Sequence, residues 1–497
     1  MNSACPRFST FTMLTHILTN SLALACLLNI TPRACADDAR LVRVLVTQQG
    51  HDPIYPWRTR PPGVRAGYGY QIDQNHVLTT EHLTRNHTLV EIQRPRTATK
   101  QTVEVLKSDP RLDLALLRLP LLPTANPLPP AETADHVQLG NDLQILQMDD
   151  SRDTETGPSR VQQIGVNRLP DASTSLLVYK LLCNLNVNGE GAPVMQGERL
   201  AGMIIAFNPN SRIATMVSAP FVNRFIEDAT HPPYRGLASA GFKWQALIDP
   251  VKRRYLNIKN DNGVLVLGAV PATSAGRLLK SSDTILKWDG HTVDKLGFYH
   301  DPAYGRVEFS HLIKAYRNPG DTVRATMIRD GAVAEIELTL NGELDNAVLV
   351  PENIAGERVE YIVAGGFILR ELDADYLRAH GSKWRAKVDT QLLNHYLGGM
   401  AEMQAPTDRV VFVSAMLADE INEGYDSHRN DILTAVNGRP IRNIDDVFQI
   451  LSDDGRIHRL SFRSDGIDVV FNPEQLDEAN ARIARQYRVS ALSYRRP

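Results

Sequence analysis

Short apolar stretches at close spacing constrain the fold of the N-terminal part of this chain more than any other sequence feature. Polar or proline-containing turns separate the stretches, and almost no helical period occurs before residue 220. Successive side chains of a strand point to opposite faces, so short alternating or apolar runs predict β-strands. The predicted strands are 41–46, 67–72, 77–83, 88–92, 102–106 and 114–119. Together they predict an all-β barrel or sandwich.

A different organisation follows this β-rich part. Residues 219–228 have a helical period and are predicted to close the first domain, and 230–234 has the composition of a linker. Beyond it, two segments share one plan, in which apolar strands precede an Asx-Gly turn at Asp289-Gly290 and at Asn437-Gly438. Such an internal repeat predicts two domains of one kind. The predicted boundaries are 1–36 for a leader, then 37–229, 236–342 and 357–485.

The first 36 residues have the composition of a secretory signal peptide. Arg7 supplies a positive charge, 17–30 is mostly apolar, and Ala34-Cys35-Ala36 is a small-residue cleavage site. The apolar run is shorter than the roughly 20 residues that a membrane-spanning helix needs. We therefore expect cleavage after Ala36 and a secreted, periplasmic protein with no integral membrane segment; a retained N-terminal anchor is the alternative.

Length and composition are ordinary for a soluble protein of about three domains. The net charge is −3, the isoelectric point is near 6.5, and no dense basic block occurs, which argues against nucleic acid as a partner. After loss of the leader, Cys183 is the only cysteine that remains, so no internal disulfide can form. Its simplest role is that of a small buried hydrophobic residue.

Three polar residues stand where a site could form. His82 follows an apolar strand, Asp113 opens the run Asp-Leu-Ala-Leu-Leu, and Glu190 lies in the loop Asn188-Gly189-Glu190-Gly191-Ala192-Pro193-Val194. Taken singly, each has an ordinary structural explanation. A histidine after a strand is most often a surface or core residue, an aspartate can begin a strand, and Gly-Ala-Pro-Val can form any turn. Their order and contexts are much more specific together.

Together these stretches resemble the HtrA/Deg-type serine proteases. Leu78-Thr79-Thr80-Glu81-His82-Leu83 is similar to the Leu-Thr-Asn-Ala-His-Val of that family, and the run from Asp113 is similar to its Asp-Leu-Ala-Leu-Leu. Gly67-Tyr68-Gly69-Tyr70 resembles its Gly-Ser-Gly-Phe. The two repeated segments look like its two PDZ domains, and 305–309 and 413–425 look most like the two-PDZ branch known from plants and some bacteria.

This resemblance covers essentially everything after the leader, and it implies a mainly β protein. The implied fold is a chymotrypsin-like double β-barrel followed by two PDZ (α+β) domains. It also implies a Ser-His-Asp site with His82 as general base and Asp113 as the residue that orients its imidazole. Family members often form trimers or larger assemblies, so the resemblance also implies a homo-oligomer.

The loop around Glu190 departs from the family pattern Gly-Asn-Ser-Gly-Gly-Pro-Val. Glu190 replaces the nucleophilic serine, and a carboxylate is a poor nucleophile toward an amide and opposes a developing oxyanion. Asn188 stands where the family has the glycine whose N–H helps to form the oxyanion hole, and Ala192 replaces a further glycine. The sequence therefore predicts a pseudoprotease.

Three other interpretations of the site remain open. An active protease could use another serine, although Ser173, Ser175 and Ser218 lie outside the nucleophile's frame. Glu190 and His82 could activate a water, although no electrophile is identified. They could also bind a metal, although two ligands hold a metal poorly. We expect neither a metal nor a cofactor.

The repeated segments predict the binding chemistry. PDZ domains bind an extended chain end by strand addition, and their backbone N–H groups capture its terminal carboxylate. By resemblance, the corresponding peptide-binding strand entries are Ala240-Gly241-Phe242 in the first copy and Ala364-Gly365-Gly366-Phe367 in the second. The alternative is a packing module with a blocked groove, above all for the second copy.

The sequence as a whole predicts a secreted HtrA/Deg homologue that binds polypeptides or C-terminal peptides and does not cleave them. Its role would be that of a scaffold, a chaperone-like protein or a regulator of an active relative. The alternative is an active trypsin-like serine endopeptidase of envelope protein quality control.

Overall fold

The structure is a computed structural model. It describes residues 39–120, 128–134, 137–169, 174–342, 344, 347–352, 358–398, 402–464 and 468–496. The predicted signal peptide, 1–36, and Ser173 lie outside these ranges. Within them, no helix is both long and apolar enough to cross a membrane.

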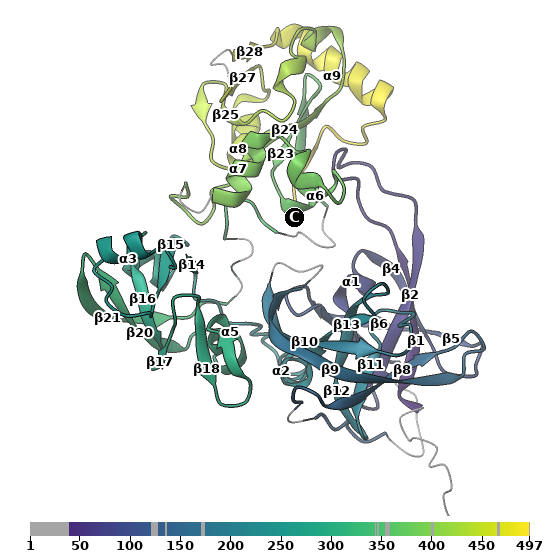
Figure 1. Ribbon diagram of the computed structural model, residues 1–497. Helices are drawn as coiled ribbons and strands as arrows, with labels where there is room; N and C mark the ends of the chain where they lie inside the picture. The colour runs from purple at the N-terminus through teal and green to yellow at the C-terminus, as the bar shows by residue number, and fades with distance from the viewer. Residues whose placement is uncertain are drawn as a thin grey trace, which may run out of the picture.

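Two β-sheets build the N-terminal domain (Figure 1). The strands of the first are β1 (Leu41–Gln48), β2 (Gly63–Gln71), β3 (His76–Thr79), β4 (His87–Gln93), β5 (Lys100–Thr102), β6 (Glu104–Asp109) and β7 (Leu114–Arg118). They lie in the order β5-β4-β1-β2-β3-β7-β6. Val42, Val44 and Val46 alternate along β1 and are fully buried, as the period of a strand requires.

The second sheet of this domain is a closed barrel. Its strands are β8 (Asp142–Met148), β9 (Thr154–Arg168), β10 (Ser175–Cys183), β11 (Pro193–Gln196), β12 (Arg199–Asn208) and β13 (Ile213–Ser218), in the order β10-β13-β12-β11-β8-β9. The helix α1 (Glu81–Thr84) follows β3, and α2 (Ala219–Thr230) ends the domain. Closure removes the free edges that an open sheet would expose.

The middle domain spans the first repeated segment. Its strands are β14 (Phe242–Ala246), β15 (Val264–Ala269), β16 (Thr284–Trp288), β17 (His291–Thr292), β18 (Phe298–Asp301), β19 (Gly305–Glu308), β20 (Thr322–Arg329) and β21 (Ala332–Thr339). Its helices are α3 (Pro250–Tyr255), α4 (Ser274–Leu278) and α5 (Ser310–Tyr316). The main sheet has the order β14-β15-β16-β20-β21, so β14 is an edge strand.

The C-terminal domain spans the second repeated segment. Its strands are β22 (Tyr361–Ala364), β23 (Phe367–Glu371), β24 (Val411–Met416), β25 (Leu433–Val436), β26 (Arg439–Pro440), β27 (Arg459–Phe462), β28 (Asp468–Val470) and β29 (Ser493–Tyr494). Its helices are α6 (Ala374–Arg378), α7 (Thr390–Gly398), α8 (Ile444–Asp454) and α9 (Pro473–Tyr487). Its sheets have the orders β24-β23-β22-β29 and β26-β25-β27-β28.

The strand pairing shows which parts of the two later domains correspond. β14 pairs antiparallel with β15 from Phe242 opposite Ala269, and β23 pairs antiparallel with β24 from Phe367 opposite Met416. Each pairing shifts register after the second residue of the first strand. β23 is therefore the counterpart of β14, but only β14 lies at a sheet edge.

Both later domains contact the N-terminal domain. Lys314 of α5 donates through Nζ to the Ser175 carbonyl at 2.6 Å, and Arg224 of α2 donates to the Lys314 carbonyl at 2.7 Å. The loop after β1 reaches the C-terminal domain (Figure 1). There the ring of Trp57 lies 5.8 Å from that of Tyr361, and Arg370 donates to the Pro53 carbonyl.

Candidate functional site

His82 and Asp113 form a buried pair in the N-terminal domain. His82 lies in α1 after β3, and Asp113 lies directly before β7, a strand that pairs with β3. Asp113 has a φ of 54°, a left-handed conformation that is uncommon outside glycine and is often found at functional sites. Its Oδ1 accepts the His82 backbone N–H at 2.9 Å, and its Oδ2 lies 2.7 Å from His82 Nδ1. The carboxylate therefore fixes the orientation of the ring.

Glu190 contacts the other nitrogen of the His82 ring. Its Oε2 lies 2.8 Å from His82 Nε2 and 2.8 Å from an amino nitrogen of Arg65, a residue of β2. This contact is an ion pair between the Glu190 carboxylate and the protonated ring. The Glu190 side chain is 38% exposed, whereas the His82 side chain is 4% exposed. The imidazole thus lies between two carboxylates.

Backbone contacts hold Glu190 in this place. Tyr68 donates its backbone N–H to the Glu190 carbonyl at 2.7 Å. Gly191 has a φ of 77°, and a Cβ there would lie 2.2 Å from the Tyr68 carbonyl oxygen. Only glycine accommodates both the conformation and the close approach. The loop therefore keeps its course past β2 with a glutamate in place of the family's serine.

The two carboxylates determine the charge of His82. Burial disfavours the charged ring, but hydrogen bonding and attraction to Asp113 and Glu190 outweigh it and raise the pKa of His82 to about 10. Interaction with His82, opposed by burial and assisted by Arg65, lowers the pKa of Glu190. Near neutral pH the site is an imidazolium held by carboxylates. A protonated ring cannot accept the proton of a nucleophile.

The backbone N–H of Asn188 is engaged as well. It donates to Gln147 Oε1 at 3.1 Å, and Gln147 is 1% exposed. The Asn188 side chain donates to the Met148 carbonyl at 2.9 Å and accepts from the Tyr68 hydroxyl at 2.8 Å. Asn188 is not among the residues with positive φ. The hydrogen of the predicted oxyanion-hole donor therefore already has a partner.

Three observations bear on the alternatives for this site. Among the described residues, no group of three or more His, Cys, Asp or Glu could hold a metal ion. Ser175 begins β10, and its carbonyl accepts from Lys314 of the middle domain. Ser218 precedes α2, and its hydroxyl is buried without a partner in the described residues. Both ring nitrogens of His82 are taken by carboxylates instead.

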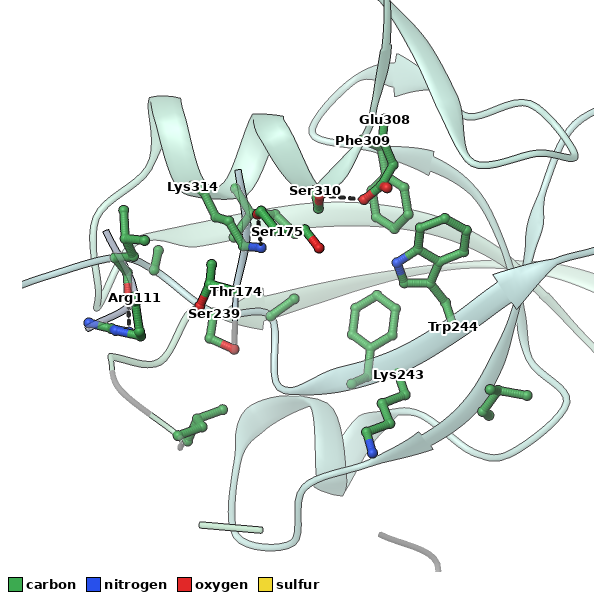
Figure 2. Close-up of a pocket in the computed structure, with 17 residues that line it drawn as sticks. Arg111, Thr174, Ser175, Ser239, Lys243, Trp244, Glu308, Phe309, Ser310 and Lys314 are labelled. Carbon is green, nitrogen blue, oxygen red and sulfur yellow. Dashed lines mark hydrogen bonds between the residues drawn. The ribbon is translucent and has the colours of Figure 1, made fainter. Parts of the chain in front are cut away.

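A second candidate site lies in the middle domain. A pocket of about 460 Å³ opens between β14 and α5, and the larger apolar side chains that line it include Leu237, Phe242, Trp244, Leu267, Phe309 and Ile313. The Trp244 and Phe309 rings lie 5.1 Å apart, and Figure 2 shows them at one end of the pocket with Arg111 at the other. Ala240 lines the pocket next to Gly241, whose φ of 73° makes the turn before β14.

This pocket has the parts that strand addition needs. No strand among the described residues pairs with the outer edge of β14, so its backbone groups can pair with an extended peptide. The apolar lining can receive a side chain of such a peptide. Arg111, Thr174 and Ser175 also line the pocket, so a bound peptide would touch the N-terminal domain as well.

The corresponding position in the C-terminal domain is occupied by the chain itself. Gly365 and Gly366 are the turn of a hairpin in which Ala364 faces Phe367, so β22 covers the edge of β23. β22 runs antiparallel to β23 and pairs on its other side with β29. The Gly365 N–H donates to Asn480 Oδ1 at 2.9 Å. Gly365, Gly366 and Phe367 were predicted to bind a peptide, but β22 already occupies the strand edge at which the peptide would pair.

Sequence reasoning did not identify Arg65, Gln147 or the covering strand β22. Arg65 and Gln147 lie 125 and 41 residues from their partners in the Glu190 loop, and no local motif indicates such contacts. β22 did have a signal, because Tyr361-Ile362-Val363-Ala364 directly precedes Gly-Gly, which is a pattern typical of a hairpin.

This chain is similar to a known domain family and to several known proteins. Residues 350–493 match the family model of a PDZ domain. The Arabidopsis thaliana protein "Protease Do-like 2, chloroplastic" is 25% identical over 410 residues, which cover 81% of this chain and 66% of that protein. "Putative protease Do-like 3, mitochondrial", from the same organism, is 22% identical over 421 residues, which cover 83% of this chain and 72% of that protein.

A solved structure has a related fold. An HtrA-type protease with a bound decapeptide aligns with a TM-score of 0.50 and 16% identity, over 61% of this chain and 94% of that chain. The mainly β fold with a closed barrel and a PDZ domain, which the sequence predicts, is confirmed.

Proposed function

We propose that this chain, a homologue of the HtrA/Deg-family proteases with a C-terminal PDZ domain, binds polypeptide chain ends through its middle domain and does not hydrolyse them. The absence of hydrolysis rests on one observation, the His82 ring held between Asp113 and Glu190. Binding rests on the free edge of β14 beside an apolar pocket. A scaffold, chaperone-like or regulatory role follows from binding without cleavage.

The alternative is an active serine endopeptidase of envelope quality control. It requires a neutral His82 next to a hydroxyl, and it requires a free N–H at the oxyanion position. His82 contacts a carboxylate instead, and the Asn188 N–H is donated to Gln147. The observed contacts therefore favour the binding function.

Peptides with a free apolar C-terminus should bind the middle domain with a stoichiometry of one per chain. Amidation of the terminus should weaken binding at least roughly tenfold, because PDZ-type recognition captures the carboxylate. Isothermal titration with alanine-rich decapeptides that end in Val, Leu or Phe, as acids and as amides, measures both quantities. A stoichiometry of one is expected because β22 covers the edge of β23.

Two matched variants locate this binding. Leu267→Asp changes a pocket residue that is 44% exposed, and Leu278→Asp changes a residue of the same domain that is 38% exposed and lies outside the pocket. Binding should weaken at least roughly tenfold in the first variant and stay unchanged in the second. Equal affinity for acid and amide peptides, or equal effects of the two variants, would show that the groove of β14 is not the binding site.

Secretion is part of the proposal. The Ala34-Cys35-Ala36 site predicts cleavage after Ala36, so the protein isolated from the cell envelope should begin at Asp37. Intact-mass analysis of that fraction measures the N-terminus directly. Recovery of the protein with residues 1–36 still attached would instead indicate the retained anchor.

A further inference from the structure

One end of the middle domain exposes apolar side chains next to the short helix α3. Ile248, Val251 and Tyr255 are 61%, 63% and 87% exposed. Val251 and Tyr255 are four residues apart in α3 and therefore lie on the same face of it. This end of the domain points away from α2 and α5 (Figure 1). A single exposed apolar residue is ordinary, but three in eight residues of a small domain form a patch.

The opposite face of α3 fixes the helix to the domain. Arg253 is 7% exposed and donates to the carbonyl of Leu247 at 2.9 Å and to that of Asn262 at 3.0 Å. Asp249 caps the helix by accepting the Val251 N–H at 2.8 Å. The apolar face therefore projects outward from a helix that is anchored to the domain. Its side chains are not used to pack the core of this domain.

Cations flank the apolar face. Lys252 and Arg254 lie on either side of it, and Lys259 follows the helix. Through their side chains, these three make no ion pair or hydrogen bond with any residue in the described ranges. Two carboxylates lie nearby in sequence: Asp249 caps the helix and keeps its negative charge there, and Asp261 pairs with Lys295 at 3.0 Å. The patch thus combines exposed apolar tips with an excess of positive charge, since three cations stand beside the single carboxylate of Asp249.

We propose that this patch, formed by Ile248, Val251, Lys252, Arg254, Tyr255 and Lys259, docks the protein on an anionic membrane surface. Apolar side chains as exposed as these can enter the boundary between headgroups and acyl chains, which adapts to their shape. Tyrosine is favoured at that depth, because its ring is apolar and its hydroxyl stays hydrated. Lysine and arginine beside them attract anionic headgroups.

An acidic protein partner is the competing occupant. It would have to supply a complementary apolar cavity for side chains that are 61%, 63% and 87% exposed. A bilayer requires no such cavity, and for this reason the geometry favours lipid. Docking would also hold the peptide-binding edge of β14 close to the bilayer, because the patch begins two residues after that strand ends.

Vesicle co-sedimentation tests the proposal on the chain that begins at Asp37, which keeps all described residues and lacks the apolar stretch of the leader. The protein should bind vesicles of phosphatidylcholine with phosphatidylglycerol, and should not bind phosphatidylcholine alone. Arg254→Glu/Lys259→Glu should raise the lipid concentration for half-maximal binding roughly tenfold or more, and added salt should have the same direction of effect. Val251→Ser/Tyr255→Ser should weaken binding roughly fivefold or more.

Controls of matched chemistry separate the patch from general effects of charge and exposure. Lys280→Glu/Lys383→Glu and Val470→Ser, at exposed positions elsewhere, should leave vesicle binding unchanged. Peptide binding should survive in every variant, because none of these positions lines the groove. Absence of binding to the anionic vesicles, or equal losses in patch and control variants, would overturn the proposal. Patch variants that change only the oligomeric state would assign the surface to a protein contact instead.

Discussion

Glu190→Ser alone is expected to give almost no proteolysis, whereas the triple variant Glu190→Ser/Asn188→Gly/Ala192→Gly should be about 10²–10³ times more active. The single change frees His82 from the second carboxylate and supplies a hydroxyl. It leaves the Asn188 N–H donated to Gln147 and the Asn188 side chain bound to Tyr68 and Met148. Asn188→Gly removes that side chain and lets the backbone turn its N–H toward a substrate.

Casein hydrolysis measures the activity of the parent, the single and the triple variants. A fluorophosphonate probe should leave the parent unlabelled, because it reacts with activated serines. Each variant is paired with an added His82→Ala, which should abolish any activity that comes from a rebuilt triad. If the single variant is as active as the triple variant, the loop is intact and Glu190 is the only defect. If the parent itself is labelled, the pseudoprotease proposal fails.

The His82 ring should stay protonated at pH 8, where an ordinary histidine is neutral. Its pKa is raised from 6.5 to about 10 by the two carboxylates. Glu190→Gln removes one of the two negative charges and should lower the pKa of His82 by at least about one unit, which corresponds to about 1.4 kcal/mol. Nitrogen chemical shifts of a histidine-labelled protein between pH 5 and pH 11 follow the titration. His76→Gln and His82→Gln assign the resonances.

The direction of the linked stability follows from this shift. The folded-state pKa of His82 lies above that of the unfolded chain, so its contribution is fully present below about pH 6.5 and is lost as the pH rises through about 10. The pKa of Glu190 is lowered, so its contribution is present above its ordinary value and is lost as the pH falls through the folded-state value. A His82 that titrates near pH 6.5 in the folded protein would contradict the ion pair.

The local sequence was enough to identify the residues of the barrel site. It was not enough to predict which other residues contact them in the folded protein. His82, Asp113 and Glu190 each lie within a short motif whose order along the chain is specific. Arg65 contacts Glu190 because β2 runs beside the Glu190 loop in the folded protein. The residues next to Arg65 in the sequence do not indicate this contact. The charge of the ring depends on that folded environment, and a motif alone would give His82 the role of a base.

The two repeats show a similar limit at the level of strands. Phe242 and Phe367 hold equivalent positions, and their sequence contexts predict the same groove in both copies. The copies differ because four residues before Gly365 fold back onto β23, while the chain before Gly241 does not fold back in this way onto β14. Whether a strand of the same chain or a free peptide pairs with this edge depends on how the chain is connected. The amino-acid composition of the two repeats does not predict the outcome.

The loop between β1 and β2 also affects how the molecule unfolds. Trp57 and Ile54 belong by sequence to the barrel domain, yet they pack in clusters formed by Tyr361, Val363 and other residues of the C-terminal domain. Trp57 is 9% exposed in the folded protein, and a chain shortened before Tyr361 would expose it. Such a chain should tend to aggregate through that loop. Because this loop joins the first and last domains through side chains, we expect heat or denaturant to melt them in a single shared transition.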